Sequence, residues 1–269
     1  MHLGRRRVVG LLSMAPALLV LTAAAQAEVD ERLKPLLDEL RTFLDAPRPV
    51  FLRQRVDVAV NGQKQEEQLQ EVWVRDLEHL RMERSDETVV VMTPEDIKMY
   101  IGPPRVMVHI PQATLEALGE DREEALGALD ITRPADSLRV VLEGAEHLPV
   151  TGEDRIGDEA CWVVTADEEL LPEFRRTLSG VPQEFELKTV QLAIGRETGV
   201  TRASFFELTG PAQLEIGVTT EEFEEDAEVT DEMLTFEAPE GALVLTWTPD
   251  KTPAQMRQER DQAIAERMK

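Results

Sequence analysis

Several residue types are scarce in this chain, and each shortage excludes a class of structure. The sequence of 269 residues contains a single cysteine, Cys161, so an intrachain disulfide is impossible and burial alone must stabilise the fold. Cys161 lies in an apolar run without a neighbouring base, which favours a small buried side chain over a reactive thiol. Aromatic residues make up only 4% of the chain, so few large rings are available to fill an interior.

Basic residues are also scarce relative to acidic ones. The chain has 29 Lys and Arg against 53 Asp and Glu, which gives a formal net charge of −24. This charge repels nucleic acid and anionic lipid head groups, so we predict no nucleic-acid partner. The acidic run at 221–226 lacks the spaced pattern of a calcium-binding loop, and we interpret it as a solvated surface.

The sequence motifs of the common enzyme classes are missing. The chain has no G-x-S-x-G, no H-E-x-x-H and no phosphate-binding glycine loop. His79, His109 and His147 lie far apart in the sequence; they could converge on a metal, but separately satisfied histidines are the simpler interpretation. We therefore predict a protein that is not an enzyme and that has no cofactor or metal.

Residues 1–27 have the organisation of an export signal. Arginines precede an apolar run over 8–21, and small residues follow, with cleavage expected after Ala27. A membrane anchor is less favoured, because Ser13 and Pro16 interrupt a run that is shorter than the ~20 residues needed to span a bilayer. We favour the general secretory route over twin-arginine export. The mature protein is expected to be soluble in the periplasm.

From residue 51 onward, apolar and polar residues alternate with the period of β-strands. The dipeptide Asn61-Gly62 follows the first alternating run and favours a tight hairpin turn. Further strands are expected at 79–84, 88–92, 97–101, 105–110, 138–142, 148–156, 185–194, 200–209 and 212–224, with another around Cys161 and a closing segment at 233–247. Short connections favour antiparallel pairing, because parallel strands need longer crossovers.

Stretches with helical spacing of apolar residues interrupt these strands. Helices are expected at 30–46, 111–130 and 168–179, and a polar helix is expected after Thr252-Pro253. We therefore predict one mainly β domain of about eleven strands over 28–249, followed by a polar helical tail over 250–269.

A single sheet of that many strands is expected to curl or to split into layers. Curling creates an inner face, and a large apolar face must be filled by side chains, covered by a helix or occupied by a ligand. The helical stripes are therefore candidate plugs for the sheet.

A series of short segments, weak one by one, follows in a fixed order along most of the mature chain. They are the N-terminal helix, the Asn-Gly hairpin, V-W-V-R with L-R-M-E, V-V-V-M-T-P-E-D-I-K-M-Y, G-E-D-R-I-G-D-E-A-C-W-V-V, L-A-I-G-R-E-T-G-V-T-R-A-S-F-F-E and L-T-F-E-A-P-E-G-A. In this order and spacing the chain resembles the outer-membrane lipoprotein carrier superfamily, which includes LolA, LolB and RseB.

The resemblance implies a single, strongly curved antiparallel sheet that forms an unclosed half-barrel, with helices as a plug or lid over an apolar cavity. Members of the family use that cavity for the acyl chains of lipoproteins or other lipids. One position departs from the family pattern. Asp76 stands where the carrier has an arginine that is thought to hold the lid, and Arg75 stands where it has a lysine.

The residues that line such a cavity are expected on one face of the first strands. Val72 and Val74 share one face of their strand and Trp73 the other, and the sequence leaves open which face is inner. We predict an apolar lining made of Leu52, Val56, Val58, Val72, Val74, Met82, Val90, Met92 and Met99. Methionine suits this role because its flexible thioether adapts to varied chains. A core filled permanently by the protein's own helices is the alternative.

The function that follows is a periplasmic binding or carrier protein for acylated lipids or lipoproteins. An alternative is an RseB-like regulator that senses envelope lipids or lipoproteins and binds a protein partner in the inner or outer membrane. A third is a domain that binds a protein and transports nothing. RseB-like proteins add a second C-terminal domain, and the length of this chain favours the carrier.

Overall fold

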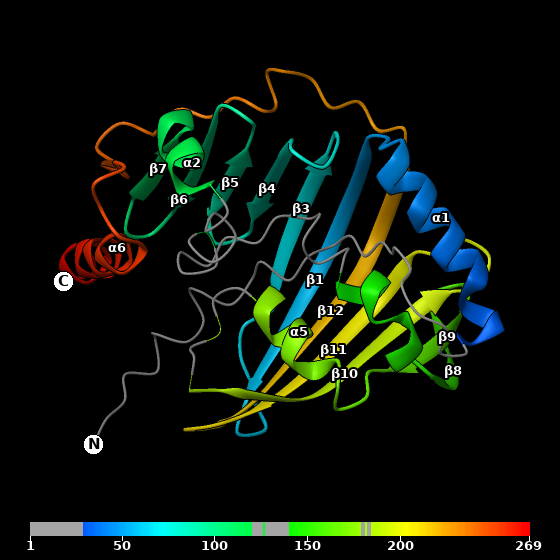
Figure 1. The fold of residues 1–269 in the computed structure, drawn as a ribbon. Helices are drawn as coiled ribbons and strands as arrows, with labels where there is room; N and C mark the ends of the chain where they lie inside the picture. Colours follow the sequence, from blue (N-terminus) through cyan, green and yellow to red (C-terminus); the bar gives the residue numbers. More distant parts are fainter. Residues whose placement is uncertain (1–28, 120–125, 127–139, 179–180, 182–183) are drawn as a thin grey trace. The chain divides into compact units, whose positions relative to one another are not determined.

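The computed structural model describes residues 29–119, 126, 140–178, 181 and 184–269. Over these residues the protein is mainly β, with helices between groups of strands (Figure 1). The predicted export signal and its cleavage position at Ala27 lie outside the described residues. None of the helices in this part of the chain is long and apolar enough to cross a membrane.

The described strands belong to one sheet of 13 strands. They are β1 (Val50–Val60), β2 (Gln63–Lys64), β3 (Gln68–Val74), β4 (Leu80–Arg84), β5 (Val89–Met92), β6 (Asp96–Ile101), β7 (Val106–Pro111), β8 (Val150–Ile156), β9 (Glu159–Thr165), β10 (Glu186–Gly195), β11 (Thr201–Thr209), β12 (Gln213–Glu225) and β13 (Leu243–Thr246). Their order is β13-β7-β6-β5-β4-β3-β1-β12-β11-β10-β9-β8, and β2 pairs with β1. Because this order has two ends, the sheet is unclosed. The predicted class, mainly β with a single open sheet, is confirmed.

The pairing is antiparallel from β3 to β7 and from β8 to β12. The strand β13 instead runs parallel to β7, with Leu243 opposite Val106. The sheet is therefore mixed. Short connections favour antiparallel pairing, but β13 follows the long segment 226–242, which leaves room for a parallel crossover.

The predicted hairpin after β1 is present. Asn61 and Gly62 have φ angles of 51° and 73°, the left-handed conformation that a two-residue hairpin turn requires. The side-chain oxygen of Asn61 also accepts a hydrogen bond from the backbone N–H of Gln213, at 2.9 Å. The dipeptide therefore sets the turn, and its side chain ties the turn to the start of β12.

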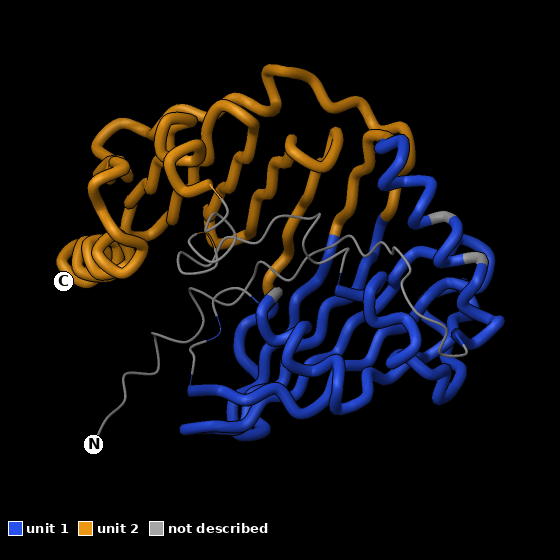
Figure 2. The backbone as a smooth tube through the Cα atoms, viewed as in Figure 1, with its two compact units in different colours: residues 1–47, 54–67, 132–222 blue, residues 48–53, 68–131, 223–269 orange. Residues whose placement is uncertain are grey.

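Figure 2 shows that the chain divides into two compact units. Unit 1 comprises residues 1–47, 54–67 and 132–222. Unit 2 comprises residues 48–53, 68–131 and 223–269. Each unit is described separately below.

In unit 1, one face of the sheet is apolar and buried. Val190, Phe206 and Ile216 lie opposite one another across β10, β11 and β12, and none is more than 5% exposed. Their neighbours along the strands, such as Gln191 and Glu215, point to the opposite face and stay accessible to water. The alternation in the sequence here reflects burial on one side only.

The helices of unit 1 supply further buried side chains. They include η1 (Glu31–Leu33), α1 (Lys34–Asp45), η3 (Ala145–His147) and α5 (Leu171–Thr177). The apolar stripe predicted at 30–46 forms one buried face made of Leu33, Leu36, Leu37 and Phe43. Helix α5 packs against β10 (Figure 1). The helices predicted at 30–46 and 168–179 are thus confirmed.

The strand predicted at 138–142 is wrong over its described part. Val140 lies in a helical turn, and the following Val141 and Leu142 are buried. A short apolar run has the same appearance in a buried helix and in a buried strand, so periodicity cannot separate the two.

In unit 2, both faces of the sheet are buried along β5. Val90, Val91 and Met92 are each 1% exposed, although successive residues of a strand point to opposite faces. The sequence V-V-V-M therefore has no alternation, as expected for a strand that is covered on both sides.

The irregular segment 226–242, drawn in orange in Figure 1, contacts one of these faces. Arg81 on β4 donates hydrogen bonds to the backbone carbonyl oxygens of Met233 and Thr235, at 2.6 and 3.2 Å. The ring of Phe236 lies 5.7 Å from the ring of Tyr100 on β6. This segment thus excludes water from a face that would otherwise be exposed.

Helices α2 and α6 belong to the described part of unit 2. Helix α2 (Gln112–Leu118) follows β7 directly and ends at Gly119, whose φ of 51° stops the helix. Helix α6 (Pro253–Arg267) begins with a capping box between Thr252 and Gln255 and packs against β7 and β13. Its buried residues are Met256, Arg260 and Ala263. The residues predicted as a polar tail therefore contribute to the core of unit 2.

Candidate functional site

All the predicted lining residues are buried, and none is more than 6% exposed: Leu52, Val56, Val58, Val72, Val74, Met82, Val90, Met92 and Met99. Most belong to unit 2, whereas Val56 and Val58 lie on the part of β1 that belongs to unit 1. Burial fits a cavity lining and a packed core equally well. Contact between these residues and a ligand therefore stays a prediction.

The register of the sheet arranges many of these residues in two rows across unit 2. The first row consists of Val72, Met82, Val90, Met99 and Val108, each opposite the next on β3 to β7. The second row consists of Val74, Leu80, Met92, Ile97 and Ile110. Directly opposite residues of paired strands point to the same face. Both rows therefore form one apolar surface, which we call the row face.

Some members of the row face were missing from the sequence prediction. Leu80, Ile97, Val108 and Ile110 are buried in the same rows as the predicted residues. The two-residue period of a strand was a sufficient signal to predict them, since each lies two residues from another row residue on the same strand.

The row face is the more deeply buried side of β3. Val72 and Val74 belong to it, at 5% and 1% exposed. Trp73 points to the opposite face, where its ring lies 5.3 Å from the ring of Phe51. The tryptophan thus packs on the second face of the sheet and does not contribute to the row face.

The row face becomes polar at one end of β4. Leu80, Met82 and Arg84 are every second residue of this strand and therefore point to the same face. The side chain of Arg84 is 4% exposed, and its Nη2 donates to Gln68 Oε1 at 2.6 Å and pairs with Asp86 Oδ2 at 2.7 Å. Burial lowers the pKa of Arg84, and the charge of Asp86 partly offsets this effect.

Three further buried polar residues accompany Arg84, and we call the group the polar end: Gln68, Gln70, Arg84 and Thr88. Gln70 lies opposite Arg84 on β3, and the backbone N–H of Arg84 donates to the carbonyl oxygen of Thr88 at 2.9 Å. These polar residues were not predicted from the sequence. The signal was an arginine in phase with Leu80 and Met82, at a position where alternation demands an apolar residue.

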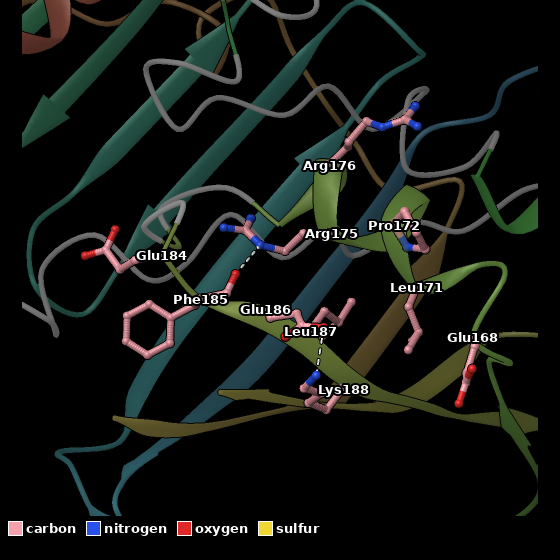
Figure 3. A pocket seen from close by; sticks show the side chains of 10 residues that line it. All are labelled: Glu168, Leu171, Pro172, Arg175, Arg176, Glu184, Phe185, Glu186, Leu187 and Lys188. Carbon is pink, nitrogen blue, oxygen red and sulfur yellow. Dashed lines mark hydrogen bonds and ion pairs between the residues drawn. The ribbon is translucent and has the colours of Figure 1, made fainter. Parts of the chain in front are cut away.

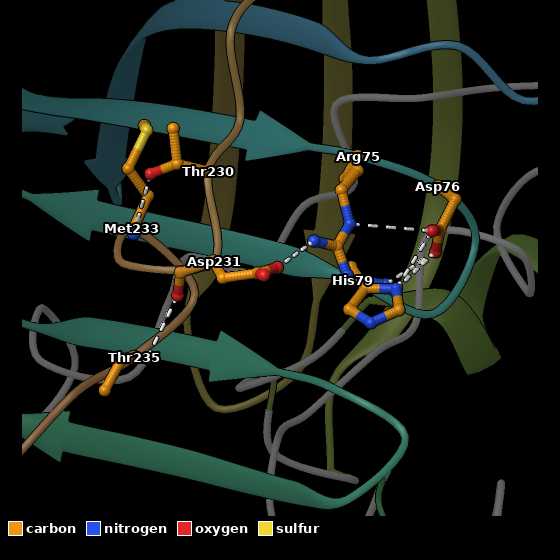
Figure 4. Close-up of polar contacts among 7 residues, drawn as sticks. All are labelled: Arg75, Asp76, His79, Thr230, Asp231, Met233 and Thr235. Atoms are coloured by element: carbon orange, nitrogen blue, oxygen red, sulfur yellow. Dashed lines mark hydrogen bonds and ion pairs between the residues drawn. The ribbon is translucent and has the colours of Figure 1, made fainter.

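The position that departs from the carrier family has a local role. Asp76 Oδ1 accepts hydrogen bonds from the backbone N–H groups of Glu78 and His79, at 2.9 and 3.0 Å, and lies 2.8 Å from Nδ1 of the His79 ring (Figure 4). Arg75 pairs with Asp231 at 2.5 Å, and its Nε lies 3.9 Å from Asp76. Asp76 thus closes the turn between β3 and β4.

The pKa of Asp76 reflects these contacts. Burial raises the pKa, but the hydrogen bonds from His79 and from the backbone of Glu78 lower it by more, so the net shift is downward from 3.8. The carboxylate is therefore ionised at neutral pH and stabilises the turn.

The described histidines His79, His109 and His147 each lie beside a different carboxylate. His79 and His109 lie in unit 2, where they contact Asp76 and Asp96 respectively. His147 lies in unit 1, with its Nδ1 2.7 Å from Asp167. Each ring thus has a carboxylate partner of its own.

An open pocket lies in unit 1, between α5 and the start of β10 (Figure 3). Its volume is about 870 Å³, and it is lined by Glu168, Leu171, Pro172, Arg175, Arg176, Glu184, Phe185, Glu186, Leu187 and Lys188. Ligand pockets in proteins commonly measure ~300 to 1,000 Å³. The residues predicted to line a cavity do not contribute to this pocket. The pocket was not predicted from the sequence, because its two walls, α5 and the start of β10, meet only in the folded protein.

The walls of the pocket are apolar in part and balanced in charge. Phe185 and Leu187 are buried, and the ionised groups comprise three acidic and three basic side chains. Arg175 donates to the carbonyl oxygens of Phe185 and Val181, each at 3.0 Å, and so ties α5 to the strand. Burial lowers the pKa of Arg175, an effect that Glu184 partly offsets. The pocket therefore lacks the strong negative charge of the chain as a whole.

Comparison with known proteins gives matches among solved structures only. No family model and no curated protein matches the chain. An uncharacterized conserved protein from Thermus thermophilus matches at 15% identity and a TM-score of 0.46, over 81% of this chain and all of that one. A LolA superfamily protein from Nitrosomonas europaea matches at 10% identity and a TM-score of 0.34, over 76% of this chain and 97% of that one.

A third match is the complex of MucA and MucB from Pseudomonas aeruginosa, at 16% identity and a TM-score of 0.41, over 79% of this chain and 62% of that chain. The LolA superfamily is the group that the sequence motifs resemble. At these identities and TM-scores the matches carry no inference about cargo, partner or activity.

Proposed function

We propose that the protein is a binding or carrier protein, not an enzyme, for acylated lipids or lipoproteins. After removal of residues 1–27 it would act in the periplasm. The observation that carries this proposal is the pocket between α5 and the start of β10, because it combines a volume suited to a ligand with walls that are apolar in part. The resemblance of the sequence motifs to lipoprotein carriers supports the same class of cargo.

The charge balance of the pocket supports an amphiphilic cargo. A chain with a net charge of −24 repels anionic head groups at long range, but Arg175, Arg176 and Lys188 offset the acidic side chains around the pocket. A lipid with a phosphate or carboxylate head group would therefore meet no excess negative charge there.

We also propose that the predicted lining residues contact hydrocarbon on the row face. Their valine and methionine side chains provide a continuous apolar surface with flexible thioethers. All of them are buried, so hydrocarbon would contact them only by displacing protein that packs on the row face.

Lipid analysis of protein purified from its native envelope tests the proposal. Solvent extracts are expected to contain acylated lipid in a stoichiometric amount, and the purified protein is expected to take up a fluorescent fatty acid. A photoreactive acyl probe would then report contacts with Leu171 and Leu187 in the pocket, and with Met82 and Met99 on the row face. An extract without lipid, together with no uptake of the fluorescent probe, contradicts the proposal.

A substitution that fills the pocket sharpens this test. Leu171→Trp is expected to weaken uptake by about tenfold if it displaces roughly two methylene groups, at about 0.8 kcal/mol each. Leu69→Trp is the matched control, because Leu69 is an exposed leucine on β3 in unit 2 and does not line the pocket. Equal uptake by both variants would remove the pocket from the proposal.

A further inference from the structure

The polar end of the row face contains donor groups that the rest of the described structure does not use. Among the described residues, Arg84 Nε and Thr88 Oγ1 are buried without a hydrogen-bond partner. Thr88 is 5% exposed and the side chain of Arg84 is 4% exposed, so bulk water does not reach either group freely. A buried donor without an acceptor costs free energy, which makes two such donors in one place unusual in a folded protein.

The two donors lie on the same face of neighbouring strands. The backbone N–H of Arg84 donates to the carbonyl oxygen of Thr88, which continues the pairing of β4 and β5 by one position beyond Glu83 and Val89. Arg84 is in phase with Met82 along β4, and Thr88 is in phase with Val90. Both side chains therefore project from the row face, next to the first row.

The contacts of Arg84 restrict the kind of acceptor that fits. Asp86 already lies 2.7 Å from Nη2 and neutralises the charge of the guanidinium group. Nη2 also donates to Gln68, which leaves Nε as the buried atom without a partner among the described residues. A neutral oxygen acceptor suits such a paired guanidinium better than a second anion, because another charge would be buried without its own counter-ion.

The apolar side chains of the row face end directly beside this pair of donors. Val72, Met82 and Val90 belong to its first row and adjoin Gln70, Arg84 and Thr88 directly. An acyl group has the same order of chemistry, with an apolar chain that ends in a neutral carbonyl oxygen.

We propose that Arg84 Nε and Thr88 Oγ1 donate to the carbonyl oxygen of an acyl ester whose hydrocarbon lies along the first row. This inference rests on the proposed function, and it adds that the protein recognises the acyl linkage as well as the chain. Thr88 and Arg84 are then the residues that distinguish an ester-linked lipid from an ether-linked one.

A comparison of two probes separates this inference from the proposed function. Fluorescent diacyl glycerophospholipid and its dialkyl ether analogue have the same chains and head group, but only the first has carbonyl oxygens. The wild-type protein is expected to bind the ester about tenfold more tightly, as for the loss of a hydrogen bond to a buried charged donor. Equal binding of the two probes overturns the inference and leaves the proposed function intact. Binding of neither probe overturns both.

Thr88→Val provides a test with little risk of unfolding. The two side chains have nearly the same shape, and the hydroxyl of Thr88 has no partner to lose among the described residues. The variant is expected to keep its melting temperature and its affinity for the ether, while its preference for the ester falls. Thr219→Val on the half-buried face of β12 in unit 1 is the matched control and is expected to retain the full preference.

Arg84→Lys completes the test, because lysine keeps the charge beside Asp86 but has no Nε. A reduced preference for the ester in both Thr88→Val and Arg84→Lys supports the inference. An unchanged preference in Thr88→Val and in a folded Arg84→Lys protein overturns it, and ordered water alone would then satisfy the two donors.

Discussion

The strands of the two units are buried in different ways. In unit 1 the strands bury one face, and polar residues such as Gln191 and Glu215 occupy the other. In unit 2 the strand β5 is covered on both faces, so that Val90 and Val91 are equally buried although they point in opposite directions. The central strands of unit 1 thus have an apolar side and a wet side, whereas β5 of unit 2 has two dry sides.

This difference explains the two kinds of strand sequence in the chain. The alternation in β12 gives a strict sequence of buried and accessible residues from Leu214 to Thr220. The apolar sequence of β5 has no such alternation, because the segment 226–242 contacts the second face of the same sheet. A loss of alternation therefore marks the strands that are covered twice.

The largest effect is expected from a residue on the buried face of unit 1. Ile216→Ala removes apolar contacts on a fully covered face and should lower the free energy of unfolding by about 3 kcal/mol. The adjacent Glu215→Ala faces the wet side and should change it by less than about 0.5 kcal/mol. Urea denaturation of both variants measures the contrast. Similar losses for the two would mean that unit 1 does not have one dry face.

The corresponding pair in unit 2 should show no such contrast. Val90→Ala and Val91→Ala each remove two methyl groups from a buried side chain, so both should lower the free energy of unfolding by about 2 kcal/mol. The same denaturation experiment applies. If Val91→Ala were nearly neutral, the segment 226–242 would not exclude water from the second face of β5.

The smallest effect concerns pH, and the two units should respond in opposite directions. In unit 1 the hydrogen bond with Asp167 raises the pKa of His147 above 6.5, burial opposes this shift, and Glu169 and Glu146 add to it. This contribution to stability is complete below pH 6.5 and is lost as the pH rises through the folded-state pKa. In unit 2 the lowered pKa of Asp76 gives a contribution that is present above pH 3.8 and is lost as the pH falls through the folded-state pKa.

Two substitutions separate these contributions. His147→Gln should flatten the pH dependence of stability on the alkaline side of 6.5 and leave the acid side unchanged. Asp76→Asn should flatten the dependence below 3.8 and leave the alkaline side unchanged. Measured unfolding free energies across both ranges check this, and a change on the wrong side for either variant would reject its assignment.

The hairpin turn and the N-terminal helix were predictable from the sequence, because neighbouring residues alone determine them. The Asn61-Gly62 turn requires positive φ angles that few other dipeptides adopt, and the stripe from Leu33 to Phe43 has only one helical face to bury. The helical turn at Val140 was not predictable, since its apolar run is too short to show a period. The parallel pairing of β13 was not predictable either, because no local signal specifies the partner of a strand that follows a long irregular segment.

The candidate site divides in the same way. The row residues were predictable as apolar positions, and their two-residue period indicated a common face. The polar end and the pocket were not, because Gln68 and Arg84 come from different strands and the pocket walls come from a helix and a strand. Side chains far apart in sequence meet only when the sheet registers are set.

By itself the sequence determined the mainly β class, the hairpin turn, the positions of most strands and the apolar character of their inner sides. Short-range geometry and hydrophobic periodicity decide these features, and both are written in neighbouring residues. The tertiary structure alone decided which strands are covered on both faces, that Arg84 is buried beside Thr88, and that α5 leaves a pocket against β10. Those outcomes depend on which distant segments pack together, and packing is a property of the whole folded chain.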